Sequence, residues 1–506
     1  HVRRSFAPVN ASDELRSEPR NLKSMLNRWA GYMIGTDGLE RSWWCLWLVL
    51  LAHALLFVAF GWMFEHHRLL VHSPILALAA GLISAGMFAL LLPALVRTST
   101  DAPGEQQLRL LFGIVVGGLL LRLLMFWTPP ALESDFYRYL WDGALTATGH
   151  NPYAYAPTKL DLAQVPQAVR DLAFEAGYVH ERINHAELRT IYPPVAQAFF
   201  ALAYRAETWS LTAWRLICLL CELATLGLLY RLLLQLGRSP LWLVLYWWNP
   251  LLIKELANAV HMEAVLLPFL AGAAFLAASH RPIAACIALA LAAGVKVWPI
   301  LIVPLLLRDL LSKPRALAVA IVVVAAIVLA CAAPPLLAGI DESSGFAVYA
   351  TSWYRNGGLI VLLQGLLAPG LGGEWANLAA RGLVAVAAGT TAVALAWQPI
   401  ASRLDLVRRM MLVALVALLL SPAQFPWYAA WVMPFMVVAP LYGVLVMTAL
   451  MPLYYTRFYF QLIDQSWVYQ DILVFAIWLP VWTILAVEWR RSAAGRATSD
   501  DRRDDR

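Results

Sequence analysis

Long apolar runs separated by short polar stretches dominate the chain. Runs such as 42–64 and 73–96 hold about 20 residues with almost no charge, and a helix of that length crosses roughly 30 Å of hydrocarbon. Several other runs are short or interrupted by proline, so the pattern predicts about 12 to 14 crossings. The expected crossings are 42–64, 73–96, 108–127, 211–234, 240–259, 263–279, 283–296, 297–308, 316–334, 376–397, 408–421, 426–440, 441–454 and 472–489.

The composition agrees with a membrane protein. The chain is 61% hydrophobic and only 14% charged, whereas soluble domains are about one quarter charged. An ordinary soluble domain is therefore excluded. The sequence predicts an all-α, polytopic transmembrane helical bundle that contacts membrane lipids.

Lysine and arginine collect in the segments that this scheme places on one side of the membrane, including both chain ends. Positive charge marks the cytoplasmic side, so we expect both termini in the cytoplasm and the net charge of +6 to reflect topology, with no nucleic-acid partner. The predicted parts are a cytoplasmic arm (1–41), two N-terminal spans (42–107), a transmembrane catalytic domain (108–489) with an acidic outer loop (128–210), and a disordered cytoplasmic tail (490–506).

The acidic outer loop opens with "ESDFYRYLWDG", which holds three carboxylates and an arginine. Glu133, Asp135 and Asp142 are candidate general bases for deprotonating an acceptor hydroxyl. If the segment is helical, Asp135 and Asp142 share a face, with Arg138 beside them to orient a carboxylate or pair with a phosphate. The competing interpretation is a salt bridge that only packs the loop.

Further polar and aromatic residues stand at span ends that face the same side. A charge facing lipid would cost a few kcal/mol, so the basic residues are expected to line a cavity and hold a leaving phosphate, although a lysine near a span end can also extend to the head groups. Aromatic residues there suit a sugar ring or an isoprenoid chain, although they can equally form an interfacial belt. The candidates are Lys254, His261, Lys296, Arg457, Tyr192, Trp427 and Tyr428.

Other chemistries receive no support from motifs. The chain has no Walker A pattern and no HExxH, and the pair His66 and His67 is isolated. We therefore predict no cofactor and no metal site, while a divalent-metal requirement is left open.

Six segments together resemble the GT-C superfamily of membrane glycosyltransferases. They resemble in particular the bacterial type that uses polyprenyl-phosphate sugars, which includes glycosyltransferase family 87 and mannosyltransferase-like proteins. The resemblance covers roughly 105–480, and its segments are "SDFYRYLWDG", "GHNPYAYAP", "ELRTIYPPVAQAFFALA", "WNPLLIKELANAVHMEA", "AAGVKVWPILIVPLLL" and "SPAQFPWYAAWVMPF".

The resemblance implies an inverting transfer of mannose or glucose from a polyprenyl phosphate to a hydroxyl of a lipid or glycan acceptor, at the extracytoplasmic face of a bacterial inner membrane. It implies an interfacial helix at 193–207. By position, Asp135 matches the base, and His261 and Lys296 match residues that bind the donor phosphate.

Two features depart from the family pattern. The spans 42–64 and 73–96 precede the helix that normally leads into the acidic loop, which suggests an added N-terminal module. Glu263 stands where relatives often have an aspartate. A transporter or flippase for lipid-linked sugars, and a lipid-linked glycan polymerase or ligase, remain as alternatives.

Overall fold

The structure is a computed structural model that describes residues 38–66 and 72–504. Within this part of the chain the regular elements are all helices, and the one isolated β-bridge joins Arg355 to Ala423. The prediction of an all-α polytopic bundle is confirmed.

The elements are α2 (Leu39–His66), α3 (His72–Ala89), α4 (Leu92–Ser99), α5 (Gly104–Phe126), α6 (Asp135–Ala147), α7 (Gln167–Ala176), α8 (Tyr178–Glu181), α9 (Pro194–Ala206), α10 (Leu211–Gln235), η3 (Pro240–Leu243), α11 (Val244–Trp247), α12 (Pro250–Leu252), η4 (Ile253–Asn258), α13 (Glu263–Ala278), α14 (Pro282–Ala293), η5 (Trp298–Ile302), α15 (Val303–Arg308), α16 (Pro314–Leu337), α17 (Gly345–Thr351), α18 (Gly358–Leu371), α19 (Gly373–Trp397), α20 (Arg403–Leu420), η6 (Pro426–Trp431), α21 (Met433–Met436), α22 (Tyr442–Leu450), η7 (Met451–Tyr455), α23 (Thr456–Leu462), η8 (Val468–Leu473) and α24 (Val474–Asp504).

Seven helical segments among the described residues are long and apolar enough to cross a membrane, and four further apolar helices are shorter. Several expected crossings are divided. The run 240–259, for example, consists of η3, α11, α12 and η4, because Pro240 and Pro250 each start a new helical piece and Asn249 caps the second one. The seven segments are Leu39–Met63, Pro74–Ser99, Gly104–Phe126, Leu211–Gln235, Pro314–Leu337, Gly373–Trp397 and Val468–Ser492.

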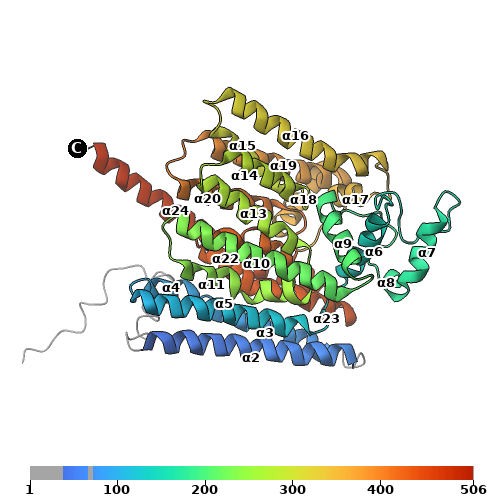
Figure 1. Ribbon diagram of the computed structural model, residues 1–506, viewed down its shortest axis with the longest axis horizontal. Helices are drawn as coiled ribbons and strands as arrows, with labels where there is room; N and C mark the ends of the chain where they lie inside the picture. The colour runs from blue at the N-terminus through green and yellow to red at the C-terminus, as the bar shows by residue number, and fades with distance from the viewer. Residues whose placement is uncertain (1–37, 67–71, 505–506) are drawn as a thin grey trace, which may run out of the picture.

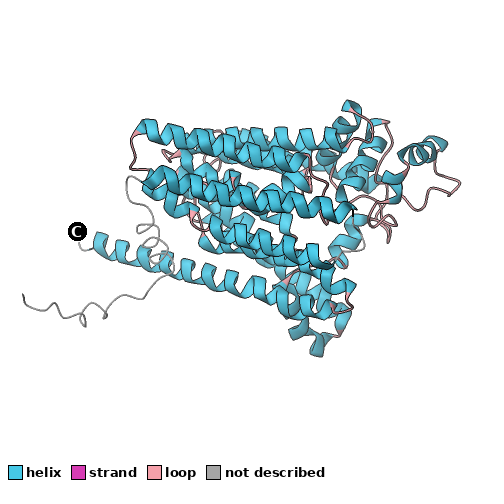
Figure 2. Ribbon diagram, turned by 90° about the horizontal axis from the view of Figure 1, so that it is seen from below, coloured by secondary structure: helices cyan, strands magenta, loops and turns pink. Residues whose placement is uncertain are grey.

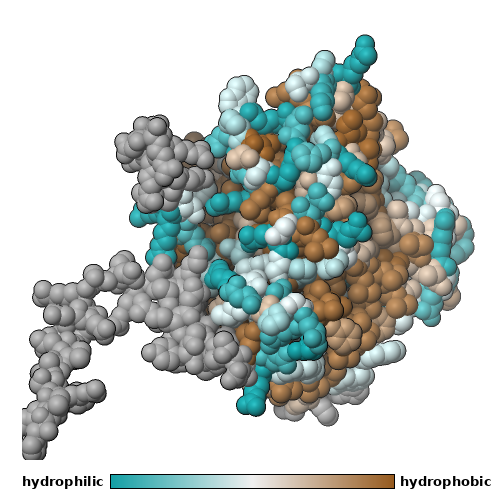
Figure 3. Space-filling model, turned by 60° about the vertical axis from the view of Figure 1, so that its left-hand side comes forward, coloured by the Kyte–Doolittle hydropathy of each residue, from teal (hydrophilic) through white to brown (hydrophobic). Residues whose placement is uncertain are grey.

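The long helices lie side by side, roughly along the long axis of the molecule, and α6 to α9 gather at one end of this bundle (Figures 1 and 2). The helix α24 leaves the bundle at the opposite end and continues to Asp504. The described part of the predicted tail, 490–506, is thus helical, in keeping with its several alanines and arginines, which favour helix. Figure 3 shows polar side chains on that end and apolar ones on the adjoining flank.

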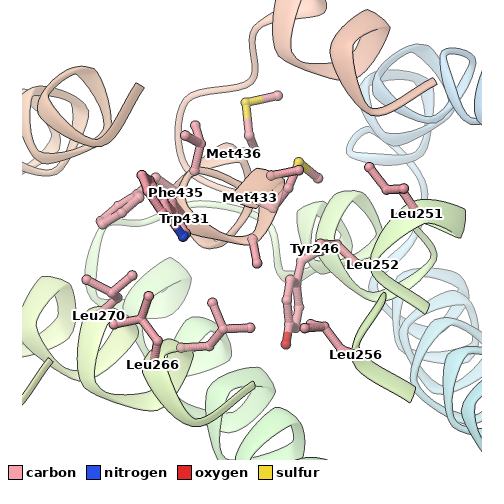
Figure 4. Packing of buried hydrophobic residues seen from close by; sticks show 14 of the residues in the cluster. Tyr246, Leu251, Leu252, Leu256, Leu266, Leu270, Trp431, Met433, Phe435 and Met436 are labelled. Atoms are coloured by element: carbon pink, nitrogen blue, oxygen red, sulfur yellow. The ribbon is translucent and has the colours of Figure 1, made fainter. Parts of the chain in front are cut away.

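Helix α13 forms the centre of the bundle, where it packs against α10 and α14 and also against η6 and α21. Leucines of α13 face Trp431 and Phe435 in a close-packed apolar layer (Figure 4). A fully buried ion pair, Arg122 to Glu222 at 2.7 Å, ties α5 to α10. Helix α10 in turn contacts α6 and α9, so this packed centre supports the end that carries them.

Helix α9, the predicted helix at 193–207, begins at Pro194, where a proline is tolerated because its missing N–H would have no partner. It packs along α6 through Phe200, whose ring stacks on Tyr139 at 4.8 Å. At Gly143 an added Cβ would lie only 2.4 Å from the backbone oxygen of Phe200. The glycine therefore sets how closely α6 and α9 approach.

Candidate active site

A cavity of about 870 Å³ lies where the start of α6 meets the bundle, a size typical of small-molecule sites. It combines carboxylates, arginines and aromatic rings with an apolar wall. Eight predicted site residues line it, namely Glu133, Asp135, Arg138, Tyr192, Lys296, Trp427, Tyr428 and Arg457. Three other predicted residues, Asp142, Lys254 and His261, are outside its lining.

The acidic segment is held at the cavity by hydrogen bonds to the bundle and to itself. Asn258 in η4 accepts from the backbone N–H of Ala131 at 3.0 Å and donates to the carbonyl of Pro129 at 3.0 Å. The Glu133 carboxylate accepts from the backbone N–H groups of Ser134 and Asp135 at 2.7 and 2.8 Å. Glu133 thereby caps the N-terminus of α6, where negative charge is favoured.

His261 lies completely buried behind this cap. Its Nε2 is 3.0 Å from a Glu133 oxygen and 3.1 Å from a Glu255 oxygen, and its ring stacks on Trp427 at 3.9 Å. The preceding Val260 has a φ of +53°, an unusual conformation for a β-branched residue, and η4 is a π-helix. Such local strain and π-helical turns are enriched at functional sites.

Glu133 and Asp135 differ in their affinity for protons. Burial opposes ionisation of Glu133, but the charges of His261 and Lys254 outweigh it and lower the pKa of Glu133 to about 2. Burial and the negative charge of Glu133 raise the pKa of Asp135 to about 7. Asn184 donates to Asp135 at 2.6 Å, and His261 Nδ1 lies 3.9 Å away. Two carboxylates with pKa values pushed apart are typical of acid–base sites.

Asp142 occupies a different environment, although α6 is helical as predicted. Seven residues are two helical turns, so Asp142 shares a face with Asp135 but lies about 10 Å further along the axis. There it is buried between α6 and α9, accepts a hydrogen bond from Gln197 at 3.3 Å, and burial raises its pKa. Arg138 donates to the carbonyl of Leu188 and anchors the following loop.

The two predicted lysines each pair with a carboxylate. Lys254 is buried, 3.1 Å from Glu255, and lies over the ring of Tyr455. It lines a separate, smaller apolar cavity beside α2 and α3. Lys296 pairs with Glu263 at 2.5 Å and lies 3.6 Å from the ring centre of Tyr428.

The predicted aromatic residues lie in two groups of packed rings that line the cavity. Trp427 is stacked between His261 and Phe425, and Tyr428 stacks on Trp431 at 4.3 Å. Tyr192 packs edge-on against Tyr139 at 5.1 Å.

Four residues of the site were missed by the sequence analysis. Glu255 adjoins the candidate Lys254 but had no signal of its own, because its role depends on the π-helical turn. Asn184 lies in an unremarkable loop. Arg355 belongs to the polar segment "TSWYRNGG", and Arg381 lies within an apolar helix, a position that could have marked it as functional.

Among the described residues no group of three or more His, Cys, Asp or Glu side chains is arranged to hold a metal ion, and the absence of a cofactor stays a prediction.

Comparison with known proteins identifies the family. Residues 52–311 match the model of the MptA_B family, described as the N-terminal domain of alpha-(1->6)-mannopyranosyltransferase. This range covers more than half of the chain, and the chain belongs to this family. No curated protein and no solved structure matches it. The match begins within α2. It confirms the predicted relation to GT-C mannosyltransferase-like enzymes. With its long apolar helices, the chain is therefore a membrane glycosyltransferase.

Proposed function

We propose that this member of the mannopyranosyltransferase family transfers a hexose, mannose in the first place, from a polyprenyl-phosphate donor to an acceptor hydroxyl in the cavity described above. The observation that carries the proposal is the position of Asp135. This carboxylate faces the cavity, has a pKa of about 7, and stands beside an ionised Glu133. A base with a pKa near the working pH is the most effective one.

The reaction then proceeds as a single displacement. Asp135 takes the proton of the acceptor hydroxyl, the hydroxyl oxygen attacks the anomeric carbon, and the bond from that carbon to the phosphate oxygen breaks. The electron pair leaves with the phosphate. Such a displacement inverts the anomeric centre, so an α-linked product requires a β-linked donor. The acceptor is a glycan or a lipid that carries a free hydroxyl.

The shape of the cavity supports a lipid-linked donor. One wall is apolar and is built from Val384, Ala385 and Ala388 of α19 together with Leu420 of α20. The small alanine side chains leave room beside the polar end of the cavity. We place this end of the molecule on the extracytoplasmic side of the bacterial inner membrane, because the basic segments lie between the spans that end on the opposite side.

The direct test is a transfer assay with the purified full-length protein. Radiolabelled β-mannosyl and β-glucosyl polyprenyl phosphates are each incubated with the protein and a membrane glycolipid extract, and the anomeric configuration of the product is determined by NMR. We expect transfer of mannose with an α-linked product. A β-linked product would refute the single displacement, and transfer from neither donor would refute the assigned reaction.

A further inference from the structure

Three of the cations that the sequence suggested for binding phosphate are already neutralised inside the protein. Each lies within about 3 Å of a carboxylate, and all three are buried or nearly so. A phosphate at any of these positions would have to displace that carboxylate or share the cation with it. The pairs are Lys254 with Glu255, His261 with Glu133 and Glu255, and Lys296 with Glu263.

Three arginines of the cavity lining are also occupied, in this case by backbone carbonyl groups. Their guanidinium groups fix the loops that surround the cavity. Arg138 donates to the carbonyls of His185 and Leu188, Arg189 donates to those of Ala338 and Gly339 and pairs with Asp341, and Arg381 donates to those of Tyr349, Ala350 and Trp353.

Arg355 and Arg457 are different. Among the described residues the guanidinium of Arg355 has no hydrogen-bond or ion-pair partner, although it lines the cavity. Arg457 donates to the hydroxyl of Tyr454 and lies 4.8 Å from the ring centre of Phe458, and it contacts no carboxylate in the same part of the chain. Tyr454 lies within the electrostatic reach of both arginines and of Glu133 and Asp135.

The side chain of Arg355 is exposed, but the backbone that carries it is held by hydrogen bonds. The N–H of Arg355 donates to Pro422, and its carbonyl accepts from the N–H of Gln424 at 2.9 Å. The next residue, Asn356, has a φ of +55°, donates to the carbonyl of Gln424 and accepts from Tyr469 at 2.8 Å. The loop therefore fixes the backbone position of Arg355 at the edge of the cavity, while its exposed guanidinium is free to meet an anion.

We propose that Arg355 and Arg457, together with the Tyr454 hydroxyl, bind the phosphate of the lipid-linked donor. The planar guanidinium groups suit the paired oxygens of a phosphate. When the sugar leaves, the phosphate changes from a singly charged diester to a monoester with an additional negative charge, and two cations without carboxylate partners stabilise that charge as it forms.

The apolar wall of the cavity next to Arg355 indicates what the phosphate is attached to. Pro422, which accepts from Arg355, follows two residues after Leu420, a residue of the apolar wall. The phosphate site thus adjoins the start of that wall, where the first isoprene units fit beside Ala385 and Ala388. The ligand class is a phosphate ester of a long-chain isoprenoid alcohol. This inference rests on the proposed function, which it extends by assigning the donor site.

The test measures binding without transfer. Farnesyl phosphate, a short polyprenyl phosphate without a sugar, is titrated into the purified full-length protein, with farnesol and inorganic phosphate as separate probes. We expect Arg355→Gln and Arg457→Gln each to raise the Kd for farnesyl phosphate at least about tenfold, because each removes charge-assisted hydrogen bonds to the phosphate. Arg205→Gln is the matched control, since Arg205 is exposed on α9 and outside the cavity lining.

The outcomes are distinct. Unchanged affinity for farnesyl phosphate in both variants would overturn the proposal, and inorganic phosphate binding as tightly as farnesyl phosphate would overturn its lipid part. Thermal unfolding shows whether a variant is folded; if Arg355→Gln is not, Arg355→Lys serves instead and is expected to bind more weakly because the guanidinium fork is lost. Arginine-dependent binding by a protein that transfers no sugar would sustain this site and refute the proposed reaction.

Discussion

Glu133 and Asp135 are two residues apart, yet their surroundings act on them in opposite directions. Glu133 caps a helix and faces a buried histidine, whereas Asp135 faces the cavity with Asn184 as its donor. The sequence predicted three candidate bases without separating them. The charges of His261 and Lys254 lower the pKa of Glu133, whereas burial and the charge of Glu133 raise that of Asp135. His261 and Lys254 are more than 100 residues away along the chain and reach Glu133 only through the fold.

The paired carboxylates predict a shifted pH profile at the residue scale. In the wild type, kcat/KM should rise with pH until Asp135 is deprotonated, near pH 7, and fall about tenfold per unit below it. In Glu133→Gln the neighbouring negative charge is gone, so the pKa of Asp135 falls and the acid limb moves to lower pH.

The measurement is kcat/KM for sugar transfer between pH 5 and 9 in both proteins. Melting curves at each pH confirm that the variant is folded. An acid limb that stays in place, or moves to higher pH, would show that Glu133 does not set the proton affinity of the base.

At the scale of elements, apolar periodicity predicted the long helices well and the broken ones poorly. Continuous runs such as 211–234 correspond to single helices, here α10. The run 240–259 contains two prolines and a capping asparagine, and these local signals outweigh its hydrophobicity. The π-helical turn of η4, which ends at Asn258, had no counterpart in the apolar periodicity.

The contact between α6 and α9 yields a prediction for Gly143→Ala. An added methyl group would meet the backbone of Phe200, so the helices must separate, at a cost of about 1–3 kcal/mol. Because α6 carries Asp135, transfer activity should fall as well. The control is Gly113→Ala in α5, where an added Cβ meets nothing within 4 Å.

Thermal unfolding in detergent and the transfer assay compare the two variants. We expect a lower melting temperature and lower activity for Gly143→Ala and near wild-type values for Gly113→Ala. Equal behaviour of the two would show that the close approach of α6 and α9 is dispensable.

For the whole molecule, charge placement predicted an orientation that the fold makes testable. The end with α6 to α9 and the cavity should face away from the cytoplasm, and the loop before α16 should face it. With the five native cysteines replaced, Asp171→Cys on α7 and Arg315→Cys at the start of α16 place single thiols at exposed positions near opposite ends.

A membrane-impermeant maleimide applied to intact cells should label Asp171→Cys and leave Arg315→Cys unlabelled until the membrane is opened. The reverse pattern would place the cavity in the cytoplasm.

Asp135 is assigned as the base in the cavity, and one comparison tests this role most directly. Label transfer from the mannosyl polyprenyl phosphate is measured for the wild type, Asp135→Asn and Asp171→Asn, the last being the same change at an exposed position of α7. We predict that Asp135→Asn loses about 100- to 10,000-fold in kcat, whereas Asp171→Asn transfers like the wild type. Full turnover by Asp135→Asn would show that Asp135 is not the base.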